Sequence, residues 1–447
     1  MKKELILKEA PVNKALLQLS IPAMMGIMVM ALYNIADTVF VGRLVGTEAI
    51  GGLSIVLPIT MLISAVGMAT GIGGASLVSR YYGATNTLMA KKTFGNLLLI
   101  TSIFGIITVI IGLVAAKPIL IAFGAKGAIF DEALIYFRIV ILGAPFLAYS
   151  MVGNNIARAE GDSKTAMNAM VFSALLNILL DALFMMVFKM GLAGAAWATF
   201  LAQVYSSLYL ARYFNSSKSI LSLSFKYWKP KGVLIKETIS IGSSTFARQS
   251  AASVIAAMIN HALIHHGGEF YVAIYGLIYR VMMFTFFPMI GIVQGFIPLI
   301  GYNFGAREKQ RVKATLKSAS WMITLVSCVC FIVIMLFPNL IMSSFSTDEK
   351  LVKAAADTLK IIGISLPLVG MQMIGASYYQ AIGKAAPALF LTLSRQVIFV
   401  IPLIYFLPKF YGIHGVFYAI PIADVVSFTT TMVFLIHSWK RLNYDPN

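Results

Sequence analysis

Long stretches of this chain contain no charged side chain at all. Residues 15–36, 49–79 and 93–116 have no Asp, Glu, Lys or Arg. About 20 apolar residues cross the hydrocarbon core of a bilayer as a helix, whereas apolar helices of soluble domains are shorter. Charged residues make up only 12% of the whole sequence, about half the usual share. The sequence therefore predicts an integral membrane protein.

The apolar stretches divide the chain into twelve predicted transmembrane helices. The segments between them are short, except for the polar, Lys-rich stretch 213–236 near the middle. We therefore expect an all-α membrane protein with a six-helix lobe at 1–212, a linker at 213–236 and a second six-helix lobe at 237–447. The spans are predicted near 15–42, 49–79, 93–116, 133–157, 165–188, 192–212, 237–264, 270–302, 314–340, 355–380, 386–408 and 413–438.

The basic residues behind the net charge of +18 are distributed according to this arrangement of spans. Lys and Arg concentrate on alternate loops, among them the N-terminal segment, the Lys91–Lys92 loop, the central linker and the segment Arg307–Lys317. Positively charged loops stay on the cytoplasmic side. Both termini are therefore expected in the cytoplasm, in a multi-pass protein of the cell inner membrane, and the basic balance does not indicate nucleic-acid binding.

An internal repeat relates the two halves. Three segments match at a separation of 221 or 222 residues: Gly83-Ala84 with Gly305-Ala306, 159–161 with 381–383, and 190–194 with 411–415. Six helices per half give both halves the same orientation in the membrane. Parallel repeats of this kind are common in transporters, which bind their substrate between two moving halves.

Two aspartates lie inside predicted spans of the first half, where a charge at mid-bilayer costs roughly 2.5–3.5 kcal/mol. Asp37 is late in the first span, and Asp181 is in the fifth, one helical turn after Asn177 and on the same face. Asn154 and Thr199, in neighbouring spans, add neutral oxygen atoms. Such a set suits a monovalent cation, or a proton shared between carboxylates. The alternative is that each Asp only caps or hydrogen-bonds a neighbouring helix.

The second half repeats the scaffold without these acids. At the repeat separation, Asn177 and Asp181 fall on Phe399 and Leu403, so the framework does not require the carboxylates. Four polar residues of the second half are candidates for a substrate cavity, although each alone is as consistent with helix–helix hydrogen bonding. They are Gln249, Tyr279, Gln294 and Gln372. The second half also carries charged residues within its spans, and Asp424 is expected to pair with Arg395.

No pattern indicates catalysis or a cofactor. The Gly-Lys-Ser/Thr of a nucleotide-binding loop is absent, which excludes direct use of ATP. His261 and His265 have the spacing of a zinc pair, but only Glu269 is near enough in sequence to join them, so solvated histidines are the preferred interpretation. We expect a protein that is not an enzyme and that uses Na⁺ or H⁺ only as a coupling ion.

Three stretches resemble the multidrug and toxic compound extrusion (MATE) transporters, most closely the bacterial and archaeal branch with drug-exporter members. They are NIADTVFVGRLVG at 34–46, NILLDALFMMVFKMGLAGAAWAT at 177–199 and VQGFIPLIGYNFGA at 293–306. The resemblance covers nearly the whole chain. It implies a V-shaped pair of bundles that exports organic cations, drugs or toxic metabolites by alternating access, in exchange for inward Na⁺ or H⁺. A monomer with a small-molecule substrate is expected.

The resemblance also implies a cation site in the first lobe, which would bind Na⁺ if the protein is sodium-coupled. Its ligands would be Asp37, Asn177, Asp181, Thr199 and the backbone carbonyl of Ala195. Neighbouring polar positions match Tyr33 and Asn154, and a first-helix proline whose kink is thought to accompany ligand binding matches Pro22.

Two alternatives remain open. A lipid-linked oligosaccharide flippase of the same superfamily would need a cationic cavity for pyrophosphate, with Arg248, Arg280 and Arg395 directed inward. A membrane scaffold without transport activity would make the aspartate cluster incidental.

Overall fold

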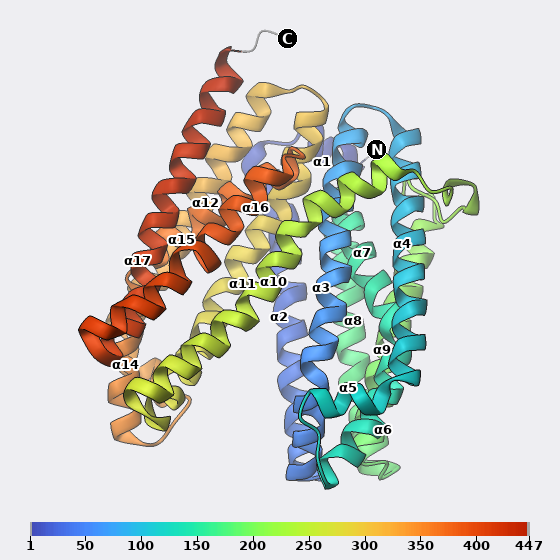
Figure 1. Cartoon of the computed structure of the whole chain (residues 1–447). Helices are drawn as coiled ribbons and strands as arrows, with labels where there is room; N and C mark the ends of the chain where they lie inside the picture. The colour runs from blue at the N-terminus through green and yellow to red at the C-terminus, as the bar shows by residue number, and fades with distance from the viewer. Residues whose placement is uncertain (1, 445–447) are drawn as a thin grey trace.

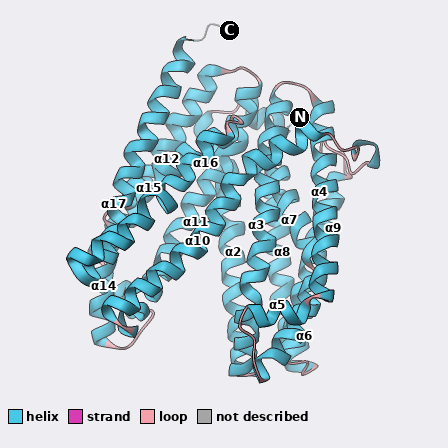
Figure 2. Ribbon diagram, in the orientation of Figure 1, coloured by secondary structure: helices cyan, strands magenta, loops and turns pink. Residues whose placement is uncertain are grey.

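The structure is a computed structural model that describes residues 2–444, within which every regular element is a helix and no strand occurs (Figure 2). The helices form two bundles, α2–α9 and α10–α17 (Figure 1). The bundles lie together at the end that carries both termini and diverge toward the other end. The predicted helical architecture is confirmed, and the V shape is visible in the divergence.

The first bundle follows a short N-terminal helix, α1. Its elements are α1 (Lys2–Lys8), α2 (Val12–Leu44), α3 (Thr47–Gly83), α4 (Thr87–Val114), α5 (Ala116–Ala122), α6 (Ala128–Leu142), α7 (Ala144–Ala159), α8 (Ser163–Asp181), the π-helical turn η1 (Ala182–Val187) and α9 (Leu192–Phe214). The central segment contains only the 3-10 helix η2 (Phe225–Tyr227).

The second bundle begins inside the segment predicted as linker, because α10 starts at Gly232. Its elements are α10 (Gly232–Gly267), α11 (Glu269–Gly305), α12 (Lys309–Leu336), α13 (Pro338–Ser343), α14 (Glu349–Gly363), α15 (Leu366–Ala381), α16 (Ala385–Leu393), the π-helical turn η3 (Ser394–Phe399) and α17 (Val400–Tyr444).

The number of membrane-crossing helices depends on whether bent or interrupted helices are counted as one span or as two. Within residues 2–444, seven helices are long and apolar enough to cross a membrane, or nine if each of two bent pairs counts as one span. The stretch Ala385–Lys440 is one of the seven, yet it contains a break at Gly412 between two predicted spans. With that stretch divided and the less apolar α9 and α10 included, the count is the predicted twelve.

The repeat is visible in the backbone. Four pairs of residues with positive φ are separated by 221 or 222 positions: Gly46 and Gly268, Thr85 and Arg307, Gly161 and Gly383, and Gly191 and Gly412. The fourth and tenth spans also bend at equivalent places, by 50° between α6 and α7 and by 48° between α14 and α15. Each bend is followed by a proline in the first turn of the next helix, where the missing N–H costs no helical hydrogen bond.

Contacts between the bundles gather at the end with the termini. The Ser76 hydroxyl of α3 donates to the carbonyl oxygens of Gln380 (2.6 Å) and Ala381 (3.1 Å) at the end of α15. Arg80 forms an ion pair with Glu237 of α10, at 2.7 Å. These contacts join the bundles at one end, while at the opposite end the bundles diverge.

Candidate functional site

Helices α2 and α8 bring the two predicted carboxylates together. Asp37 in α2 is 8% exposed, and Asp181, the last residue of α8, is fully buried. The two carboxylates are close enough to interact electrostatically. Asp181 is followed directly by the π-helical turn η1, and π-helical turns occur frequently at functional sites.

Asn177 connects this acid pair to α9. With its amide oriented to satisfy both neighbours, its nitrogen donates to Asp181 Oδ2 and its oxygen accepts from the backbone N–H of Thr199, each at 3.2 Å. Ala195 is buried one helical turn before Thr199, on the same face of α9. Four of the predicted cation ligands, Asp37, Asn177, Asp181 and Thr199, are therefore neighbours in space, and Ala195 lies beside them.

Two tyrosines complete the surroundings of the acids. Tyr33 lies one turn before Asp37 and interacts electrostatically with both carboxylates. Tyr136 of α6 lies near Thr199 and is close enough to Asp37 to interact with it electrostatically. Tyr136 was not predicted as part of this site, because a single tyrosine in an apolar span carries no signal until the packing of α6 is known.

Among the described residues, no base forms an ion pair with either acid. Neither Asp37 nor Asp181 forms an ion pair with a residue in the described range 2–444, and one oxygen of each, Oδ1, is buried without a hydrogen-bond partner. Buried carboxylate oxygens are unfavourable unless a cation, a proton or a donor satisfies them. The arrangement therefore fits a monovalent cation or proton, which two carboxylates, the Thr199 hydroxyl and nearby amide oxygens would surround.

Two other predicted residues lie away from this cluster. From the end where α7 and α8 are joined, helical rise places Asn154 and Asp181 on the order of 20 Å apart along the bundle. Pro22 lies about 22 Å from Asp37 along α2, at the contact with α11 where Gly291 and Gly295 meet Met24 and Ser20. The structure therefore does not bring Asn154 or Pro22 to the carboxylates.

The second bundle contains a cavity of 460 Å³ near the middle of its helices. Gln249 and Tyr279 line it, as predicted, together with Arg395 and Asp424. The expected pairing is confirmed, with Arg395 Nε 2.7 Å from Asp424 Oδ1. Arg280, by contrast, is exposed and does not line this cavity.

Two of the four predicted cavity residues lie elsewhere. Gln372 is buried in α15, where its amide donates to the backbone carbonyl of Asp424 at 2.6 Å. Gln294 lies in the contact half of α11, beside Asn155 and Arg158 of α7. Gln294 is 15 residues from Tyr279 along α11, about 22 Å, and so belongs to the joined rather than the diverging half.

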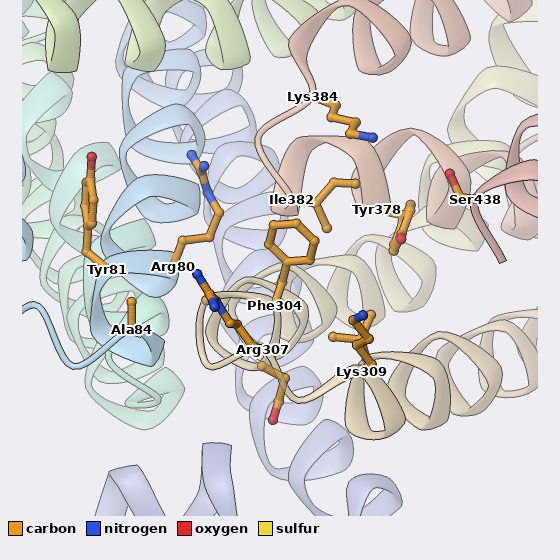
Figure 3. A pocket seen from close by; sticks show the side chains of 13 residues that line it. Arg80, Tyr81, Ala84, Phe304, Arg307, Lys309, Tyr378, Ile382, Lys384 and Ser438 are labelled. Atoms are coloured by element: carbon orange, nitrogen blue, oxygen red, sulfur yellow. The ribbon is translucent and has the colours of Figure 1, made fainter. Parts of the chain in front are cut away.

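The largest cavity described, 780 Å³, lies where the bundles meet at the end with the termini (Figure 3). Its labelled side chains include Arg80 of α3 and Arg307, Lys309 and Lys384 of the second bundle. These are loop and helix-end residues, so the basic character follows the charge distribution of the loops at this end.

Comparison with known proteins gives consistent matches over the whole chain. The MatE family matches residues 22–183 and 246–406, one range in each bundle. The multidrug export protein MepA of Staphylococcus aureus (strain MRSA252) is 27% identical over 445 residues, covering 98% of this chain and 97% of the relative. A solved structure described as the outward-facing conformation of a multidrug resistance MATE family transporter is 26% identical, with a TM-score of 0.93 over 100% of this chain and 99% of the other. A structure of MATE in the straight conformation is 27% identical, also with a TM-score of 0.93, and covers both chains fully.

Proposed function

The chain belongs to the MatE family of membrane transporters, and from this premise we propose that it exports organic cations in exchange for Na⁺ or H⁺. It is a transporter rather than an enzyme. A relative named as a multidrug export protein, aligned over nearly the full length of both chains, supports drugs or toxic metabolites as the exported compounds. The protein works without a bound cofactor in this proposal, and its partners are a small-molecule substrate and the bilayer.

The observation that carries the coupling proposal is the uncompensated acid pair. Asp37 and Asp181 lie close enough to interact electrostatically inside the first bundle, each with a buried oxygen that lacks a partner in the described part of the chain. A bound Na⁺ would take oxygen ligands from Asp37, Asn177, Asp181, Thr199 and the Ala195 carbonyl. A proton shared by the two carboxylates would serve the same electrostatic purpose.

Alternating access follows from the arrangement of the bundles. We take 1–212 and 237–447 as the two moving lobes and 213–236 as their linker. With both termini in the cytoplasm of a plasma-membrane protein, the joined ends close the cytoplasmic side and the diverging ends open outward (Figure 1). Cation binding at Asp37 and Asp181 neutralises the first lobe and weakens its attraction for a cationic substrate, so the two ligands exclude each other.

The driving force depends on the charge of the substrate. Exchange of one Na⁺ for one monovalent organic cation moves no net charge, so only the concentration gradient of the ion would drive it. Exchange for a neutral or zwitterionic compound would also use the membrane potential, which supplies roughly 2.3 kcal/mol per charge at 100 mV.

Efflux of fluorescent cationic dyes by everted vesicles tests the proposal, with Na⁺ and pH gradients imposed separately. One gradient is expected to drive dye transport in the unmodified protein, and Asp37→Asn and Asp181→Asn are each expected to abolish the dependence on it. Asp131→Asn, an exposed aspartate at the start of α6, is the matched control and should transport normally. Unchanged ion-driven exchange in both acid variants would overturn the assignment of the site.

The flippase alternative is not favoured. Arg248, Arg280 and Arg395 directed inward would have favoured it, but Arg280 is exposed and does not line the cavity that Arg395 lines. The full-length relative carries the name of an export protein.

A further inference from the structure

The second lobe holds positive charge in the middle of the membrane. Arg248 of α10 and Arg395 of η3 lie near the centres of their predicted spans, and they are close enough for their charges to repel. The positive-inside rule accounts for basic residues in loops, not for arginines at this depth. An ionisable residue within a membrane span is a candidate functional group, because placing it there is unfavourable.

A single acid in this cluster does not balance the two arginines. Asp424 is 3% exposed in its side chain and is fully engaged, since Oδ1 accepts from Arg395 at 2.7 Å and Oδ2 accepts from the Ser365 hydroxyl at 2.7 Å. Arg248 forms no ion pair with any residue in the described range. The cluster therefore carries an excess of one positive charge, whereas the first lobe has two acids without an ion pair in the described range.

The excess charge borders the 460 Å³ cavity. Arg395 lines it, its guanidinium lying 5.7 Å from the centre of the Phe286 ring, and Gln249 lines it directly beside Arg248 in the chain. Most of the remaining wall is apolar or aromatic, including Ile255, Tyr275 and Met282. A ligand that matched this cavity would have an apolar body and one acidic group.

We propose that the cavity of the second lobe binds the carboxylate or phosphate group of an amphipathic organic anion, with Arg395 contacting the oxyanion and Arg248 supplying the field that attracts it. Arg395 retains donors beyond Nε, so it binds the ligand without releasing Asp424. The proposal rests on the proposed transport function, because it adds organic anions and zwitterions to the class of compounds that the protein carries.

Equilibrium binding to the purified protein tests the site without depending on transport. The probes are 1-naphthaleneacetate and its uncharged analogue 1-naphthaleneacetamide, which share the same ring. The acid is expected to raise the midpoint of thermal unfolding at concentrations at least about tenfold lower than the amide needs. Equal effects of the two probes would overturn the proposal.

Variants locate the binding. Arg248→Gln breaks no ion pair, so it should fold normally and weaken binding of the acid by about tenfold, with little change for the amide. The double variant Arg395→Gln/Asp424→Asn removes the contact while leaving no buried acid unpaired, and it should abolish the preference for the acid. Arg280→Gln, an exposed arginine of α11, is the matched control. Retention of full affinity for the acid in Arg248→Gln and in the double variant would reject the site.

Lipid nanodiscs distinguish the sources of the acidic group. If an anionic headgroup occupies the cavity, affinity for 1-naphthaleneacetate should fall when phosphatidylglycerol replaces part of the phosphatidylcholine, and Arg248→Gln should remove this competition. If the ligand comes from water, both lipid compositions should give the same affinity. Either result supports the anion site, since both require the acid to bind. If the unmodified protein binds 1-naphthaleneacetate as expected but shows no ion-driven dye efflux, the proposed transport function is rejected and the anion site is retained.

Discussion

Gly83 of α3 lies directly against the backbone carbonyl oxygen of Tyr302 in α11. Gly305 of α11 lies in the same way against the carbonyl oxygen of Arg80 in α3. The repeat separation of 222 positions relates Gly83 to Gly305 and Arg80 to Tyr302. The same contact is thus made twice between the bundles, once from each half. A backbone carbonyl cannot rotate aside, so a Cβ at either glycine would force the two helices apart.

Gly83→Ala should destabilise the contact between the bundles by about 1–3 kcal/mol, the usual effect of overpacking. Spin labels at Thr87→Cys and Gln310→Cys, two exposed positions on different bundles, would report the separation after Cys328 and Cys330 are replaced by alanine. The distance distribution should shift to longer values.

Gly276→Ala is the control for that change. Gly276 is also in α11, but apart from its chain neighbours and the adjacent backbone of its own helix, no atom of the described residues lies within 4 Å of the position a Cβ would take there. An unaltered distance distribution in Gly83→Ala, or an equal shift in Gly276→Ala, would contradict the role of the paired glycines.

Ser76→Ala should destabilise the same contact between the bundles less, by about 1 kcal/mol. The buried hydroxyl of Ser76 is the donor to two carbonyl oxygens at the end of α15, and helix ends leave such carbonyls without partners in their own helix. The label distance should increase less than in Gly83→Ala. Ser54→Ala removes a hydroxyl of α3 that bonds only to Ile50 in its own helix, so it should leave the distance unchanged. If the label distance increased more in Ser54→Ala than in Ser76→Ala, the hydrogen bonds from Ser76 to the end of α15 would not be what holds the bundles together.

The repeat and the acid pair were predictable for different reasons. Glycine and positive φ are linked by backbone sterics, so matched glycines such as Gly191 and Gly412 marked equivalent breaks in the sequence itself. Asn177 and Asp181 were predictable as neighbours because one helical turn separates them. Tyr136 was not, since its approach to Thr199 depends on how α6 packs on α9. The sequence also did not indicate that Gln294 and Tyr279, both in α11, lie in different halves of that helix.

Asp181→Asn should stabilise the protein in buffer at pH 8 that contains no Na⁺, by about 1–2 kcal/mol. The substitution removes one of two buried carboxylates that lack a base, and the new amide oxygen still accepts from Asn177. The unmodified protein should gain stability when its coupling ion is added, either as Na⁺ or by lowering the pH. Asp181→Asn should gain no stability from the ion. Thermal unfolding under these conditions measures both effects. A variant that is less stable without the ion and equally stabilised by it would contradict the proposed site.

Glu160 ties the central segment to the first bundle. Its carboxylate accepts from the Tyr213 and Ser219 hydroxyls, each at 2.7 Å, and from the backbone N–H of Ile220 at 2.9 Å. The glutamate is 2% exposed, so its removal would leave several buried donors without an acceptor. The repeat has Ile382 at the matching position, which indicates that the glutamate serves the linker and not the shared scaffold.

Glu160→Ala should therefore release the linker, at a cost of about 2–3 kcal/mol, and should speed tryptic cleavage after the exposed residues Lys218 and Lys226. Glu160→Gln keeps one acceptor oxygen, so its rate of tryptic cleavage should lie between those of the unmodified protein and Glu160→Ala. Asp357→Ala, an exposed acid of α14, controls for the loss of charge. If cleavage is no faster in Glu160→Ala, the linker is held by other contacts. If it is faster, the segment up to Leu221 moves with the first lobe, and the motion between lobes must be taken up closer to the start of α10.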